Sequence, residues 1–194
     1  MATMTHGAPL REVVDQEQFQ DLVLKSHSLI QKILFSIPGV HNSSIYMKTL
    51  QLKSPDNTKM VIMATNIGIP EAPVISAVSE NCTLETSLSK ITEGLHLHRE
   101  LLNVVLPKLN NNEKMMELSN DVRDLDLLIQ RMLKLIQKST PPAPTYKPVV
   151  LRLPGEYDIQ VAAHLTLWKL QAFGQDVVKC LRSMDPSDEE EPDS

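Results

Sequence analysis

The sequence predicts an all-α protein, a long-chain four-helix bundle with up-up-down-down topology and two long crossover connections. Three observations lead to this prediction. Four segments repeat apolar residues in steps of three and four, which is typical of helices that bury one face. The connections between these segments are long, short and long. Aromatic residues make up only 4% of the 194 residues, which favours helices packed on helices over a β-sandwich.

The first helix is expected over residues 16–35. Its apolar face repeats at Phe19, Leu22, Ser26, Leu29 and Ile33. Pro38 and Gly39 are expected to stop it, because proline removes a helical hydrogen bond and clashes with the preceding turn. Residues 36–79 then form a long crossover with four prolines and one short helix near residues 59–64.

The second and third helices are expected over residues 84–106 and 113–138. Thr83 is a suitable N-cap for the second helix. The third helix has the most regular period, at Met115, Leu118, Val122, Leu125, Ile129, Met132 and Ile136. Such regularity over about seven turns is typical of a bundle helix.

The fourth helix is expected over residues 157–184, after a linker of residues 139–155 that contains five prolines. The bundle then spans residues 16–184 as one domain. Residues 1–15 are expected to be a flexible N-terminal segment. Residues 185–194 are acidic and cannot bury apolar surface, so they are expected to be disordered.

The lengths of the connections predict the topology. A helix of about 27 residues is roughly 40 Å long. A connection of about five residues reaches only about 17 Å, so the second and third helices must be antiparallel neighbours. The proline-rich linker reaches roughly 56 Å when extended and can join parallel helices, as can the first crossover.

Charge and motifs exclude several function classes. The net charge is -5, and no cluster of Lys and Arg is interleaved with aromatic residues, so nucleic acid is a poor partner. The apolar runs are too short to insert across a membrane. Without a phosphate-binding glycine loop, a nucleophile elbow or a Cys-x-x-Cys motif, neither an enzyme nor a cofactor is expected. His96 and His98 point to different helix faces and lack a nearby third ligand, so a structural role is expected rather than a metal site.

The sequence leaves the cellular compartment open. The first ten residues lack the apolar stretch of a secretory leader. Either the protein is cytosolic, or a secretory leader was removed. In the second case, some of residues 1–7 would not be native to the protein. The N-glycosylation sequons at Asn42 and Asn81 suit the second alternative, although about one such match arises by chance.

Short stretches of the sequence are similar to one family of helical signalling proteins. Gly-Ile-Pro-Glu-Ala-Pro at residues 68–73, followed by Leu-Ser-Lys-Ile-Thr-Glu-Gly-Leu at residues 88–95, resembles the granulocyte colony-stimulating factor family. Residues 8–10, 25–33 and 163–165 resemble the mature start, first helix and last helix of that family. The similarity covers about residues 8–184, and the chain is identified as a divergent, non-mammalian member of the family.

The resemblance implies a secreted cytokine, monomeric when free. It would bind and bring together class I cytokine receptor ectodomains and thereby drive proliferation and differentiation of granulocyte-lineage cells. The residues matching the family's major receptor patch are Lys25, Ser28, Gln31, Lys32, Asp121 and Asp124. Ser28 and Gln31 stand where the family more often has an acidic and a basic residue, so the charge pattern is half retained.

A second receptor patch is implied by the crossover and the entry to the fourth helix. Lys59 and Ile62 match the crossover part, although Lys59 stands where an acidic residue is usual. Leu151 and Leu153 are expected to supply the apolar part.

The cysteines depart from the family, which typically has two small disulfide loops in its crossover. This chain has only Cys82 and Cys180. The predicted topology places the start of the second helix and the end of the fourth at one end of the bundle, so a disulfide bond is conceivable. The alternative is two free thiols, with Cys180 packed in the core.

Three other functions fit parts of the pattern. An interleukin-six-like cytokine shares the bundle and the connection lengths. A lipid-carrying helical bundle would open its Met-rich third helix onto apolar ligands, although Met at core spacing more often fills packing gaps. An intracellular helical adaptor would have reduced cysteines and no leader.

Overall fold

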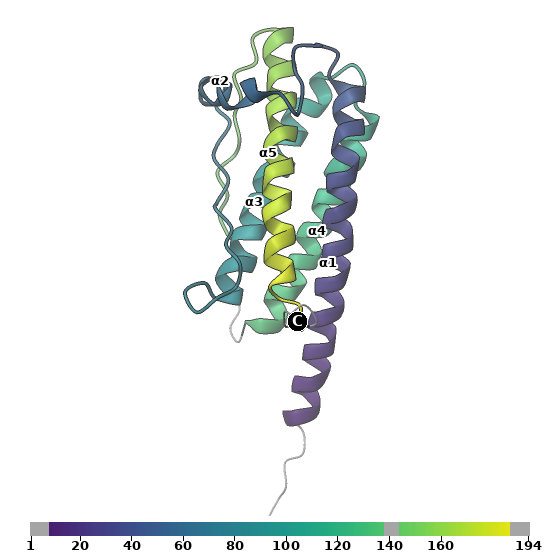
Figure 1. Ribbon diagram of the computed structural model, residues 1–194, viewed down its shortest axis with the longest axis vertical. Helices are drawn as coiled ribbons and strands as arrows, with labels where there is room; N and C mark the ends of the chain where they lie inside the picture. Colours follow the sequence, from purple (N-terminus) through teal and green to yellow (C-terminus); the bar gives the residue numbers. More distant parts are fainter. Residues whose placement is uncertain (1–7, 138–143, 187–194) are drawn as a thin grey trace, which may run out of the picture.

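The computed structural model describes residues 8–137 and 144–186, and in this part of the chain it contains helices and no β-strand. The main helices are α1 (Ala8–Ser44), α3 (Leu84–Val105), α4 (Glu113–Ile136) and α5 (Glu156–Arg182). A short helix, α2 (Val61–Ile67), lies in the first crossover (Figure 1). Two 3₁₀ turns, Pro55–Thr58 and Leu106–Lys108, complete the described elements. The prediction of an all-α helical bundle is confirmed.

Helix α1 is longer than predicted at both ends. It begins at Ala8 rather than near residue 16, and it continues through Pro38 to Ser44. A proline inside a helix costs about 3 kcal/mol, which is why the sequence suggested a stop there. The apolar residues beyond Pro38 offset this cost, because Val40 and Ile45 are both buried. The expected end of the first helix was therefore wrong.

The other three long helices lie close to their predicted ranges. Helix α3 begins after Thr83, whose side chain accepts a hydrogen bond from the Thr86 backbone N–H as an N-cap does. Helix α4 ends at Ile136, two residues before the expected position, and residue 138 lies outside the described part. The short crossover helix lies at Val61–Ile67 and ends at Gly68, whose φ of 95° is the left-handed conformation common after helices.

Side-chain contacts define how the long helices run. In the pair α1 and α4, Ser26 contacts Met132 while Lys32 contacts Asp121, so these helices are antiparallel. In the pair α3 and α4, Glu85 contacts Gln137 while Asn103 contacts Ser119, so these two helices are antiparallel as well. Helices α1 and α5 are also antiparallel, because Gln20 contacts Met184 while His41 contacts His164.

The core runs the length of the bundle and is formed by apolar residues from all four long helices. The periodic residues of α4 from Met115 to Met132 are fully or almost fully buried, as the sequence predicted. Gly94 of α3 is required for close packing, because a Cβ there would lie 2.2 Å from the Phe173 ring of α5. Among the described residues, no helix combines the length and apolar character needed to cross a bilayer.

The crossover is fastened to the bundle by a partly buried chain of hydrogen bonds. His41 of α1 contacts His164 of α5 at 2.8 Å between Nε2 and Nδ1. His164 Nε2 contacts Asn57 Oδ1, also at 2.8 Å, and the Asn57 amide donates to the Gln51 and Leu52 carbonyls. Three segments that are distant in sequence are thereby joined at one end of the bundle.

The second long connection lies beside the first. The Arg152 backbone N–H donates to the Ile67 carbonyl at 2.8 Å, which joins the linker to the end of α2. Both connections run along the same side of the bundle, next to α3 and α5 (Figure 1). The face formed by α1 and α4 is left open.

Candidate functional site

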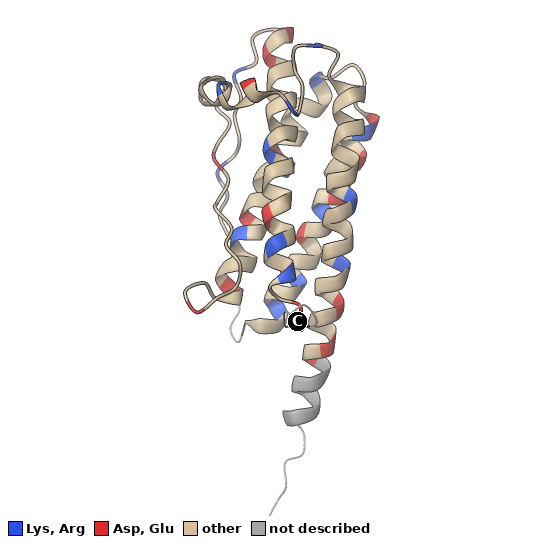
Figure 2. Cartoon of the chain, viewed as in Figure 1, with Lys and Arg blue, Asp and Glu red and all other residues tan. Residues whose placement is uncertain are grey.

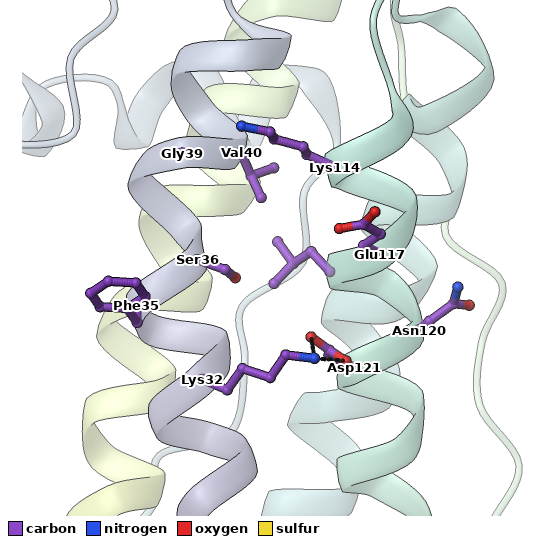
Figure 3. A pocket seen from close by; sticks show the side chains of 10 residues that line it. Lys32, Phe35, Ser36, Gly39, Val40, Lys114, Glu117, Asn120 and Asp121 are labelled. Atoms are coloured by element: carbon purple, nitrogen blue, oxygen red, sulfur yellow. Dashed lines mark hydrogen bonds and ion pairs between the residues drawn. The ribbon is translucent and has the colours of Figure 1, made fainter.

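The face between α1 and α4 brings together two of the predicted receptor-binding residues. The Lys32 ammonium contacts both carboxylate oxygens of Asp121 at 2.9 Å (Figure 3). Lys32 is exposed, whereas the Asp121 side chain is only 17% exposed. The hydrogen bond and charge of Asp121 raise the pKa of Lys32, and Glu117 and Asp124 act in the same direction. The two residues therefore form one interhelical ion pair rather than two separate charges.

The other predicted charges of this face are paired along their own helices. Lys25 contacts Asp21 at 2.7 Å, one turn earlier on α1. Asp124 contacts the neighbouring Arg123 at 3.1 Å. Exposed pairs of this kind contribute only about 0–1 kcal/mol to stability, so a protein partner can replace either member at little cost. Acidic and basic residues are interspersed over the bundle rather than gathered by sign (Figure 2).

An open groove of about 570 Å³ lies beside the ion pair. Val40 and Leu118, both buried, contribute to its lining. Lys114 and Glu117 of α4 border it (Figure 3). Gly39 leaves the α1 side open, because a Cβ there would meet no atom within 4 Å. The groove therefore offers apolar surface framed by charges of both signs.

Phe35 is the most exposed large apolar side chain described, at 90%. It lies at the α1 edge of the groove, with its ring turned outward and away from α4 (Figure 3). Leu24, which is 57% exposed, lies on the same stripe of α1. The exposed residues Ser28 and Gln31 lie between them on this stripe. From Leu24 to Phe35, the four residues follow one another at spacings of four, three and four. Two predicted polar residues therefore lie between two exposed apolar ones.

Sequence reasoning missed Leu24 and Phe35. Both are apolar residues within a helix whose other apolar positions were assigned to the core. The helical register of α1 could have revealed them. Neither residue falls on the buried face marked by Leu22, Ser26 and Ile33. An apolar residue off the buried stripe is a candidate for contact with a partner.

The second predicted patch lies on α2 and the linker. Ile62 is 72% exposed, and Lys59 is exposed and contacts Asp56 at 3.4 Å. Leu151 and Leu153 instead are half-buried and pack against the core. The exposed apolar residue of this linker is Val150, at 77%. The extended linker alternates its side chains, so residues 149, 151 and 153 face the bundle and Val150 faces outward.

The predicted modification sites and histidines lie elsewhere. Asn42 and Asn81 are both exposed, which leaves their glycosylation a prediction. Cys82 and Cys180 are present as free thiols. His96 stacks on Tyr146 with ring centroids 3.7 Å apart, whereas His98 is buried and donates from Nδ1 to the Gly94 carbonyl. Within residues 8–137 and 144–186, no group of three or more acidic, His or Cys side chains is arranged to hold a metal ion.

No model of a known protein family matches the sequence, and a comparison with curated proteins finds no match either. The geometry of the α1 and α4 face is therefore the basis for assigning a function.

Proposed function

We propose that this chain is a secreted helical cytokine that binds class I cytokine receptor ectodomains and brings them together. In this proposal it acts on granulocyte-lineage cells, in the manner of the granulocyte colony-stimulating factor family, and carries out no catalytic step. The proposed topology is up-up-down-down. It is supported by α4 running antiparallel to both α1 and α3, and by α1 running antiparallel to α5.

The observation that carries this proposal is the composition of the α1 and α4 face. An exposed aromatic ring, an open apolar groove and an interhelical ion pair lie together on two rigid helices. Aromatic side chains that become buried on binding contribute much of the energy of protein interfaces. Charged pairs around them contribute orientation and association rate more than affinity. The face thus has the composition expected of a protein-docking surface.

The position of the second patch fits a protein that holds two receptor chains. Ile62 and Val150 are exposed on α2 and the linker, which lie beside α3 and α5 (Figure 1). The groove lined by Lys32 and Asp121 lies between α1 and α4. The two patches therefore occupy different sides of the bundle. A receptor chain bound at one patch would leave the other patch accessible to a second receptor chain.

The experiment that tests the proposal reverses two charges on α4. In the variant Asp121→Lys with Asp124→Lys, the ion pair to Lys32 is replaced by like charges at the centre of the face. We expect affinity for the immobilised receptor ectodomain to fall about tenfold or more, because like charges facing a matched surface cost several kcal/mol. The helical circular dichroism signal and cooperative unfolding should persist, because Lys32 is exposed and a lysine at position 121 can extend its ammonium group to solvent.

A matched control reverses two acidic residues on the opposite side of the bundle. Glu93 of α3 and Asp176 of α5 are both exposed, and Glu93→Lys with Asp176→Lys makes the same change in net charge. Receptor binding should survive in this control. Equal binding by the α4 variant and the control, with both folded, would contradict the assignment of the docking face.

A further inference from the structure

Two cysteines that are distant in sequence lie on neighbouring turns at one end of the bundle. The Cys82 sulfur lies 3.2 Å from Ser87 Oγ, and the same Ser87 side chain and Cys82 both act on the pKa of the Cys180 thiol. Ser87 is fully buried near the start of α3, and Cys180 is fully buried near the end of α5. The crossover cysteine and the α5 cysteine therefore have the Ser87 side chain as a common neighbour.

Backbone contacts on both sides hold this arrangement in place. Ser79 and Cys82 exchange two backbone hydrogen bonds, of 3.0 and 3.2 Å, which form a tight turn. The Val78 backbone N–H donates to Ser183 Oγ at 3.0 Å, and Ser183 Oγ donates to the Cys180 carbonyl. The turn that carries Cys82 is thus fixed to the turn of α5 that carries Cys180, before any covalent bond forms.

The Ser87 hydroxyl has a hydrogen-bond partner besides the Cys82 sulfur. Ser87 Oγ already donates to the Ser76 carbonyl at 3.4 Å. A disulfide needs Cα separations of about 4.4–6.8 Å, so the bond requires the Cys82 sulfur to turn from Ser87 Oγ toward Cys180. The hydrogen bonds between the Cys82 turn and the end of α5 hold the two backbones beside each other for this step.

The two thiols differ in accessibility. Cys82 is half-buried and can be reached by a small oxidant, whereas Cys180 is enclosed. Burial raises the pKa of Cys180 to about 11, so this thiol stays protonated at neutral pH in the folded protein. Cys82 is therefore the first of the two to react.

We infer that Cys82 and Cys180 form an intramolecular disulfide bond that ties the end of the crossover to the end of α5, with a glutathione-type disulfide as the oxidant. In the first step the Cys82 thiolate attacks the oxidant's S–S bond, forming a mixed disulfide and releasing one thiolate, which takes up a proton. In the second step Cys180 gives up its proton as its sulfur attacks the Cys82 sulfur, and the departing second thiolate takes up that proton and leaves as a thiol. Two protein thiols are oxidised and the oxidant is reduced to two thiols. This inference does not depend on receptor binding.

The test is to refold the denatured, reduced full chain in a mixture of reduced and oxidised glutathione. We expect a monomer whose mass is lower by two hydrogens, without a titratable thiol after denaturation. Proteolysis should release one disulfide-linked pair of peptides containing Cys82 and Cys180. The melting temperature should exceed that of the reduced protein by about 10 °C, because the bond closes a loop of roughly 100 residues in the unfolded chain.

Two single variants assign the order of reaction. In Cys180→Ser, Cys82 should accumulate as a mixed disulfide with glutathione, because the second step is blocked. In Cys82→Ser, the folded protein should keep a free Cys180 thiol that glutathione does not modify. Two free thiols in the refolded wild-type protein, a glutathione adduct as its final product, or disulfide-linked dimers would each overturn the inference, whether or not the variants fold.

Discussion

The buried histidines are the residues whose charge state matters most for the folded structure. Their hydrogen bonds fix the tautomers, because the Asn57 amide nitrogen already donates to two carbonyls. Asn57 Oδ1 must therefore accept from His164 Nε2, which leaves His164 Nδ1 to accept from His41 Nε2. One added proton can be accommodated on His41 Nδ1 without any change, or on His164 Nδ1 if His41 changes its tautomer. A second proton would place two N–H donors against each other.

This arrangement predicts that the protein loses stability in acid. Burial lowers the pKa of His164 and of His98 to about 4, and it also lowers the pKa of His41. The unfolded chain binds more protons than the folded one below about pH 6.5, so the free energy of unfolding should fall from there to about pH 4. The loss should reach up to about 3 kcal/mol for each of His164 and His98, as measured by urea unfolding at a series of pH values.

The variant His164→Gln provides the control for acid sensitivity. Glutamine can keep a hydrogen bond to Asn57 but does not titrate, so the variant should be less stable at neutral pH and should lose less stability on acidification. An unchanged slope between pH 6.5 and 4 would show that His164 is not a source of the pH dependence.

Phe35 carries a second prediction at the residue scale. Because its ring is 90% exposed, Phe35→Ala should change the free energy of unfolding by less than about 0.5 kcal/mol. Receptor affinity should fall about tenfold or more, if the ring becomes buried at the centre of the interface. The matched control is Val74→Ala, at an 80% exposed position in the crossover, which should leave affinity unchanged. Equal affinities for the two variants would remove Phe35 from the interface.

At the scale of single elements, the sequence predicts the interiors of helices better than their ends. The period of α4 placed its buried residues correctly, because each lies on one face regardless of the rest of the chain. The end of α1 was misjudged because the local preference of Pro38 and Gly39 is outweighed by burial of Val40 and Ile45 against distant segments. No local pattern reports contacts of that kind.

The continuity of α1 can be tested by replacing its two helix-breaking residues one at a time. If residues 38–44 are helical, Pro38→Ala should raise the free energy of unfolding by about 1–2 kcal/mol, since it restores a hydrogen bond and relieves a clash. Gly39→Ala should add about 0.5–1 kcal/mol, because its Cβ would meet no atom within 4 Å. Destabilisation by both substitutions in thermal unfolding would indicate a turn at this position instead of a helix.

The linker before α5 shows a different limit of sequence reasoning. In its described part, residues 144–155, the proline-rich linker contains no helix, as the sequence indicated. Leu151 and Leu153 were chosen for the surface patch because they are apolar. In an extended segment alternate side chains face opposite directions, so the half-buried leucines flank the exposed Val150. The alternation of side chains follows from the extended backbone and could be expected from the sequence. Which side chains face the bundle depends on packing against the neighbouring α2, which the sequence does not show.

At the scale of the whole molecule, connection lengths and helical periods were enough to predict a helical bundle. The residues of the candidate site were less predictable. Lys32 and Asp121 were singled out as separate charges, and their pairing depends on the relative position of α1 and α4 along their axes. The contact of Cys82 with Ser87, and that of the Cys82 turn with the end of α5, likewise depend on segments that only the folded chain brings together.

The central claim is that the face between α1 and α4 docks a class I cytokine receptor. Hydrogen exchange of the protein alone and with a saturating amount of receptor ectodomain tests it most directly. The expected result is slower exchange over residues 24–36 of α1 and 114–124 of α4, the segments that carry Phe35, Lys32 and Asp121. Failure to bind, or protection confined to the outer sides of α3 and α5, would contradict the claim.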